Sequence, residues 1–275
     1  MIIIRQKKEE RTNKKTSYLE VLSFSGFFNP FFNSSFSLQA FFQHVDQQNI
    51  DAWYCLGDLV GYAPWPNEVV QEIRKRKIPT IAGNYDVGVG LNSDDCGCAY
   101  KTDEDRANGA KSIAFTNANI GKEERKFLRQ LPKHIHIDIP FTDGSKRMLL
   151  VHGSPRKVNE YLFEDREEKS LIRIFEQSHC DIMCFGHTHI PYHRNLVSDE
   201  KTFHAINLGS VGKPKDGDPR GGYVILDLDV TLPYSDQNSF KVEFQRFEYP
   251  VDEAAAAIRQ TELPDVFAQK LLEAH

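Results

Sequence analysis

Polar residues with metal-binding side chains stand directly after apolar runs in this chain. They are Asp58 after AWYCLG, Asn84 after IPTIAG, His152 after MLLV, and His187 and His189 after CDIMCFG. Apolar runs of this length predict buried strands, and polar side chains at the carboxyl ends of strands in an open α/β sheet gather at one edge. The sequence therefore predicts that these side chains share one site.

The chemistry of this set is that of a metal site. A carboxylate can bridge two cations, an amide oxygen can bind a cation, and neutral imidazole suits zinc, iron, nickel or manganese. Each residue also has an ordinary structural role open to it, because Asp58 and Asn84 follow glycine, where turn and cap residues are common. An isolated histidine is likewise more often structural. The combination of GD, GN, HG and GHTH at strand ends favours the metal site.

Apolar periodicity predicts strands that alternate with helices through the first two thirds of the chain, which indicates an α/β fold. The predicted strands are residues 18–23, 52–56, 79–82, 135–139, 148–151 and 181–185. The predicted helices are residues 36–48, 67–75, 104–117, 123–131 and 165–178. Later strands at 203–207, 222–227 and 240–247 predict a second sheet, and helices at 252–260 and 264–274 follow it.

Composition bounds the class of protein. The 275 residues are 40% hydrophobic and 27% charged, which suffices for a sizeable core. We expect a disordered tail over residues 1–16, a main domain over 17–250 and C-terminal helices over 251–275. A net charge of -5 gives no general attraction to nucleic acid or to anionic membranes, so we expect neither as a partner. The apolar run at residues 2–4 is too short for a signal peptide or a membrane span, and a cytoplasmic location is expected.

The five cysteines fall into two groups. Cys55, Cys180 and Cys184 lie in apolar segments that predict buried strands, which suits a reducing compartment. Cys96 and Cys98 lie in the loop DDCGCAY, where a spacing of one residue is poor for zinc. A packing or loop role is favoured for this pair, and a redox or metal role is the alternative.

The ordered strings resemble those of the calcineurin-like metallophosphoesterases, in particular the small bacterial and archaeal phosphodiesterases with diadenosine tetraphosphatase-like names. The matching strings are GDLVGYAPWPNEVV, AGNYD, VHGSP, FGHTHIP and NLGSVGKPKDGDPRGGY, within residues 18–230. The resemblance implies a four-layered αββα sandwich with two divalent transition metals (Mn, Fe, Zn or Ni) at the strand ends. It also implies that Asp58 bridges both metals, that Asn84, His152 and His187 hold the second, and that His189 holds the first. Water between the ions would attack phosphorus in line.

One departure from the family pattern concerns the first metal. The family carries an Asp-x-His string after its first strand, whereas residues 23–36 here are rich in phenylalanine and contain neither Asp nor His. We therefore expect the second metal site to fill better than the first. Two explanations stay open: a true degenerate member, or an error in the reading frame of the first three dozen residues. Intact mass and resequencing of the gene distinguish them.

A second departure is Tyr85, which stands where many relatives have a histidine that protonates the leaving group. The ordinary pKa of tyrosine is about 10, so Tyr85 is a poor acid near neutral pH. Activated phosphodiesters are therefore expected to be cleaved better than alkyl monoesters. Asp86 either orients a neighbouring ligand or caps a helix, and Arg220 either reaches a substrate phosphate or lies in a plain strand connection.

The predicted function is metal-dependent hydrolysis of a phosphodiester or phosphomonoester, with a small phosphate ester or a nucleotide-like molecule as substrate. The alternative is a catalytically degenerate member that serves as a binding or scaffold subunit, as the missing ligands would allow. The sequence leaves the natural substrate, the physiological metal and the oligomeric state open, and an oligomer is compatible with it.

Overall fold

The computed structural model describes residues 1–7, 35–48, 50–199 and 201–275. Its strands are β1 (Ile2–Lys7), β2 (Ala52–Tyr54), β3 (His134–Phe141), β4 (Gly144–Val151), β5 (Ile182–Phe185), β6 (Tyr192–Ser198), β7 (Lys201–Asn207), β8 (Gly221–Asp229) and β9 (Phe240–Phe247). Its helices are α1 (Phe36–Val45), α2 (Pro66–Lys75), α3 (Asn84–Gly90), α4 (Asp103–Asn119), α5 (Lys122–Gln130), α6 (Glu168–Ser178), α7 (Val251–Arg259) and α8 (Asp265–Glu273).

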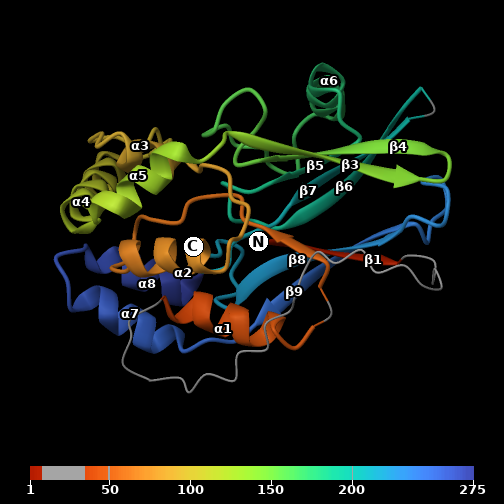
Figure 1. The fold of residues 1–275 in the computed structure, drawn as a ribbon. Helices are drawn as coiled ribbons and strands as arrows, with labels where there is room; N and C mark the ends of the chain where they lie inside the picture. Colours follow the sequence, from red (N-terminus) through yellow and green to blue (C-terminus); the bar gives the residue numbers. More distant parts are fainter. Residues whose placement is uncertain (8–34, 49, 200) are drawn as a thin grey trace.

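The strands form two mixed sheets that lie face to face (Figure 1). The first sheet has the order β2-β1-β8-β9, and the second has the order β3-β4-β5-β7-β6. Side chains alternate between the faces of a strand, and β8 shows the result. Val224 and Leu226 pack into the cluster between the sheets, whereas Tyr223 and Ile225 pack against the helices on the outer face.

Helices cover the outer face of each sheet. On the first sheet, α1 and α2 contribute Phe41 and Ile73 to the same cluster as Ile225. On the second sheet, α6 contributes Leu171 and Phe175. Helix, sheet, sheet and helix therefore follow one another, and the predicted αββα sandwich is confirmed. The C-terminal helices α7 and α8 pack against each other in a smaller apolar cluster.

Strand β1 corrects the expectation that residues 1–16 form a disordered tail. It pairs antiparallel with β2 and parallel with β8, so it occupies an interior position in the first sheet. A strand between two neighbours with both faces covered needs apolar residues on both faces, which Ile2, Ile3 and Ile4 supply. The predicted strand at 18–23 and the phenylalanine-rich stretch up to residue 34 lie outside the described residues.

Two further predictions about strands are wrong, and helix α3 and strand β6 were not predicted. Residues 79–82 form only an isolated bridge from Thr80 to Cys55, because Pro79 has no N–H for a ladder. Helix α3 was not predicted, since Gly88 and Gly90 lower its helix propensity. The late strands do not make a sheet of their own. Strand β7 lies beside β5 in the second sheet, together with β6, which was not predicted. Strands β8 and β9 belong to the first sheet.

Other predictions are confirmed. Strand β9 has the predicted bounds, and α2 begins at Pro66. His134 and His136 are both exposed on β3, because alternate residues of a strand face the same side. Cys55, Cys180 and Cys184 are buried. None of the helices in the described part of the chain is long and apolar enough to cross a membrane.

A histidine pair on β6 and β7 makes the stability of the second sheet dependent on pH. His193 Nε2 and His204 Nδ1 lie 2.9 Å apart and their rings stack, so one nitrogen donates and the other accepts. Burial lowers the pKa of His204 to about 4, and the neighbouring His193 adds to this shift. Burial also lowers the pKa of His193. The folded state therefore holds this pair neutral where an unfolded chain would protonate it.

We expect the protein to lose stability as the pH falls from 6.5 toward about 4, because the unfolded chain binds a proton that folded His204 refuses. His204→Gln keeps a hydrogen-bonding group beside His193 and should reduce that loss by about 1–2 kcal/mol. Urea unfolding at several pH values measures the free energy. His134→Gln, on the exposed face of β3, is the matched control. An equal pH dependence in wild type and His204→Gln would contradict the assignment.

Candidate metal centre

Three strand ends bring Asp58, His152 and His187 together. Asp58 follows β2, His152 follows β4 and His187 follows β5. Their ligand atoms lie within 4.8 Å of one another. Asp58 Oδ2 is 3.1 Å from His152 Nε2, and the His152 and His187 ring centroids are 5.2 Å apart. The predicted grouping of these three side chains at one edge of the sheets is therefore present.

The backbone at these strand ends is strained. Asp58 has φ 53°, His187 has φ 65° and His189 has φ 62°. Residues other than glycine seldom adopt this left-handed region, and each such residue costs on the order of 1 kcal/mol. The surrounding packing must hold these turns, and strain of this kind clusters at functional sites.

Backbone acceptors fix the orientation of two imidazole rings. His152 Nδ1 donates to Leu56 O at 2.7 Å, and His189 Nδ1 donates to Lys213 O at 2.5 Å. Since a carbonyl can only accept, the neutral form of each ring leaves its Nε2 lone pair free. Nε2 of His187 is buried without a hydrogen-bond partner, and Nε2 of His152 is buried beside the Asp58 carboxylate, 3.1 Å from its Oδ2. His152 and His187 can therefore each offer Nε2 to a cation.

Asn84 presents an oxygen in the same way. Its Nδ2 donates to Cys96 O at 3.0 Å and to Cys98 Sγ at 3.2 Å, which leaves Oδ1 buried without a partner. The next residue, Tyr85, donates its backbone N–H to Asp58 Oδ1 at 3.0 Å, so Asn84 lies next to a residue that contacts the carboxylate. A buried acceptor without a partner costs about 1–3 kcal/mol. A cation among Asn84 Oδ1, His152 Nε2 and His187 Nε2 would remove that cost, and this donor set fits a divalent transition metal.

Charges in the site oppose one another. Burial raises the pKa of Asp58, but His152 and His187 lower it further, to about 2. Burial lowers the pKa of His152, and the Asp58 carboxylate raises it overall. Burial followed by His152 lowers the pKa of His187 to about 4. Asp58 is therefore ionised, and a cation would compete with a proton for His152.

Asp86 holds the two loops that carry Asp58 and Asn84. The fully buried carboxylate accepts from the backbone N–H of Asp58 at 2.7 Å, of Leu59 at 2.9 Å and of Gly83 at 2.9 Å. Burial and the Asp58 charge raise its pKa to about 7, while the backbone donors oppose that rise. Asp86 thus both caps the start of α3 and orients the loop of a candidate ligand, which are the two roles that the sequence had left open.

A cavity of about 220 Å³ opens beside these residues. It is lined by Asp58, His152, His187, His189 and Lys213, among others. His189 lies outside the group of three whose ligand atoms are within 4.8 Å, so its role as a ligand of a first metal stays a prediction. Lys213 was not predicted, although its loop GKPKDGDPR had been singled out for Arg220.

Comparison with known proteins decides the family. The family model described as the calcineurin-like phosphoesterase superfamily domain matches residues 33–231. The chain belongs to this superfamily. It is 31% identical over 249 residues to an uncharacterised protein of Methanocaldococcus jannaschii, which covers 86% of this chain and 91% of that protein.

Two solved structures resemble this phosphoesterase-family chain. A metallophosphoesterase from Sphaerobacter thermophilus is 26% identical with a TM-score of 0.64, over 87% of this chain and 94% of that one. A hypothetical protein from Pyrococcus horikoshii has a TM-score of 0.70 at 19% identity, over 87% and 94% of the two chains, which is a likeness of fold alone. The predicted diadenosine tetraphosphatase-like branch stays a prediction.

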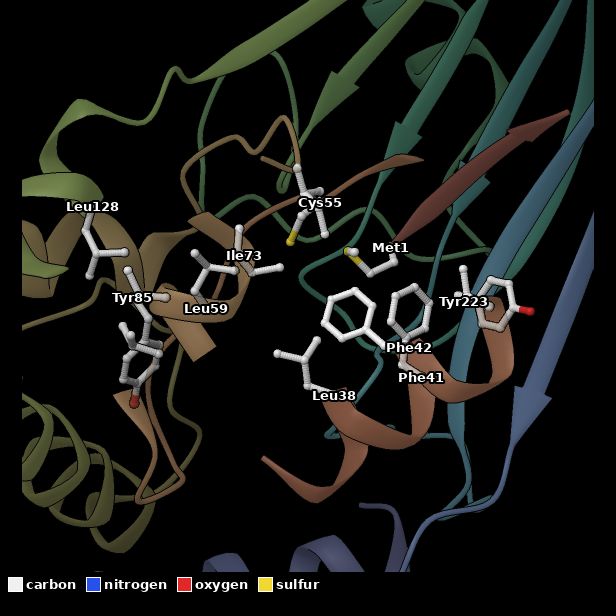
Figure 2. Packing of buried hydrophobic residues seen from close by; sticks show 14 of the residues in the cluster. Met1, Leu38, Phe41, Phe42, Cys55, Leu59, Ile73, Tyr85, Leu128 and Tyr223 are labelled. Carbon is white, nitrogen blue, oxygen red and sulfur yellow. The ribbon is translucent and has the colours of Figure 1, made fainter. Parts of the chain in front are cut away.

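Tyr85 does not belong to the site of this family member. Its ring is 1% exposed and lies in the apolar cluster with Leu59 and Leu128 (Figure 2). Its hydroxyl donates to Ser112 Oγ at 3.2 Å, and burial raises its pKa far above the ordinary value. The aromatic side chain lies in the core, so the Tyr85 hydroxyl is not placed to act catalytically as the leaving-group acid that relatives have at this position.

Arg220 is engaged elsewhere too. Its guanidinium pairs with the Asp218 carboxylate in the same loop at 2.7 Å, and its side chain is 51% exposed. A guanidinium group binds carboxylates as well as phosphates, and the Arg220 guanidinium is paired with the Asp218 carboxylate. The same loop instead brings Lys213 to the cavity, with Nζ 3.8 Å from the centroid of the Tyr62 ring.

Asp86→Asn should lower the free energy of unfolding by about 2 kcal/mol at pH 8, because an amide cannot accept from all the backbone donors as a carboxylate does. Chemical denaturation in the presence of EDTA measures this without any contribution from metal. Asp94→Asn, on an exposed residue of the following loop, is the control. Equal stability of Asp86→Asn and the control would show that Asp86 does not hold these loops.

Proposed function

We propose that this protein is a metal-dependent phosphoesterase that hydrolyses a phosphodiester or phosphomonoester of small or nucleotide-like substrates. The observation that carries the proposal is the convergence of the Asp58 carboxylate with the buried imidazoles of His152 and His187. The buried, unpartnered Oδ1 of Asn84 supports it. A divalent cation bound there supplies Lewis-acid polarisation of a phosphate oxygen and lowers the pKa of a water. The residues that would hold it are Asp58, Asn84, His152 and His187.

The rest of the cavity has groups that suit a phosphate substrate. Lys213 places an amine in a wall that it shares with the histidines. Burial lowers the pKa of Lys213, and an anion beside it would favour the protonated form again. Asp86 keeps Asp58 in position through its backbone, so the carboxylate does not need to reorganise when substrate arrives.

A second candidate function is a binding or scaffold subunit without turnover, and the ligand set of the described residues favours it. Asp58, His152 and His187 have ligand atoms within 4.8 Å of one another, which is a cluster for one ion. A single well-formed metal site would suffice for binding, while turnover in this family uses two ions by resemblance.

We expect wild-type protein to retain about one manganese ion per chain tightly, with any further ion bound weakly. His187→Ala should weaken the tight affinity by more than about tenfold, because it removes one of the buried donors. Elemental analysis and calorimetric titration measure the stoichiometry and the affinity. His134→Ala, an exposed histidine on β3, is the matched control. Protein that binds no manganese, zinc, iron or nickel would refute the metal-dependent function.

With manganese present, a chromogenic phosphodiester should be hydrolysed faster than an alkyl phosphomonoester. The reason is that Tyr85, at the position of the family's leaving-group acid, is buried in the core, so a leaving group that needs no protonation is favoured. Initial rates on bis(p-nitrophenyl) phosphate and β-glycerophosphate test this. Comparable or faster turnover of the monoester would count against it, and metal binding without any turnover would support the scaffold function instead.

A further inference from the structure

Two thiols face each other in the loop that follows α3. Cys96 Sγ and Cys98 Sγ lie 3.1 Å apart, with one residue, Gly97, between them. A disulfide joins sulfurs at about 2.05 Å, so a shift of about 1 Å would close the pair. The other cysteines, Cys55, Cys180 and Cys184, are buried among strand residues in the two sheets' packing layers.

The loop is held in the shape that brings these thiols together. Gly97 has φ 71°, which turns the chain where a side chain would be strained. Its N–H donates to Asp95 Oδ1 at 2.8 Å, and its carbonyl accepts from Asn159 Nδ2 at 2.7 Å. A Cβ at this position would meet Asn159 Nδ2 at 2.9 Å. Glycine, the turn and the two hydrogen bonds together fix the approach of the sulfurs.

The same loop contacts a candidate metal ligand. Asn84 Nδ2 donates to Cys98 Sγ and to the carbonyl of Cys96, and these bonds aim Asn84 Oδ1 away from the loop. Cys98 is partly exposed, whereas Cys96 is buried with its Sγ 3.6 Å from the Tyr100 hydroxyl. Movement of either sulfur would therefore shift the Asn84 amide and its Oδ1.

We propose that Cys96 and Cys98 are a reversible thiol–disulfide modification site, and that closing the disulfide weakens the hold of Asn84 on the metal. The first half stands on the geometry of the loop. The second half rests on the proposed function, since it requires Asn84 to be a metal ligand. The reacting partner is a small-molecule disulfide, of which oxidised glutathione is the probe.

The exchange balances in two steps. The partly exposed Cys98 sulfur loses its proton and attacks one sulfur of the glutathione disulfide. An S–S bond forms to Cys98, and one glutathione thiolate leaves and takes up the proton. The Cys96 sulfur then attacks Cys98 Sγ, releases the second glutathione as a thiol and completes the protein disulfide. Two cysteine thiols are oxidised and one glutathione disulfide is reduced. A ring with a single intervening residue is tight, so a dithiol should reopen it readily.

The test uses the full chain, first reduced and then incubated with oxidised glutathione, with and without manganese. Trypsin releases residues 78–101 as one peptide, which contains Cys96 and Cys98 and no other cysteine. After alkylation of the denatured protein, this peptide should carry no alkyl group and be lighter by two hydrogens than its reduced form. The remaining three cysteines should be alkylated fully, which provides the internal control. Dithiothreitol should restore alkylation of both loop cysteines.

Manganese titration of the same samples tests the second half. The dissociation constant should rise about tenfold on oxidation and return on reduction. Cys96→Ser, which lacks the second thiol, should stop at a glutathione adduct on Cys98.

Loop cysteines that stay fully alkylated, or that each carry glutathione, would overturn the modification site. A disulfide that leaves manganese affinity unchanged would overturn its coupling to Asn84. If the reduced protein binds no manganese, the proposed function and the coupling both fail, while the peptide mass still decides whether the disulfide forms.

Discussion

The buried Asp86 carboxylate is the interaction on which the site depends. It accepts from the backbone N–H groups of Asp58, Leu59 and Gly83, so it joins the loop after β2 to the start of α3. These loops come from separate strands of the chain and have no regular ladder between them beyond the bridge from Cys55 to Thr80 among the described residues. Without an ionic acceptor at this point, Asp58 and Asn84 would lose their common frame.

Two energetic costs occur at or near the loops that Asp86 joins. One is the left-handed backbone at Asp58, His187 and His189, and the other is the set of buried lone pairs without partners. Neither cost helps the fold. Both become intelligible if a cation binds among these atoms, because coordination satisfies the lone pairs and the strained turns aim the side chains. Family membership agrees with this interpretation.

The two sides of the cavity differ in the potential metal ligands that they carry. The side with His152 and His187 has one ring fixed by a backbone carbonyl, two buried imidazole nitrogens and a neighbouring carboxylate. The side with His189 has one ring fixed in the same way and a lysine. This difference is why metal binding and turnover must be considered separately for this chain.

The sequence by itself determined the fold class, the order of most strands and helices, and three residues that meet at the site, because apolar runs and the polar residues that end them are local features. The grouping of Asp58, His152 and His187 followed from that rule without any knowledge of the strand order. Helix α3 escaped detection because tertiary packing and the Asp86 cap outweigh two glycines.

Only the tertiary structure decided which way each remaining side chain faces. Tyr85 and Asn84 are adjacent in sequence, yet the Tyr85 side chain enters the core and the Asn84 amide contacts the loop of Cys96 and Cys98, since successive residues at the start of a helix point about 100° apart. Arg220 and Lys213 share a loop, and a local carboxylate engages the first while the cavity receives the second. The direction of β1 was equally invisible, because an apolar run of isoleucines pairs well in either orientation and its neighbours make the choice.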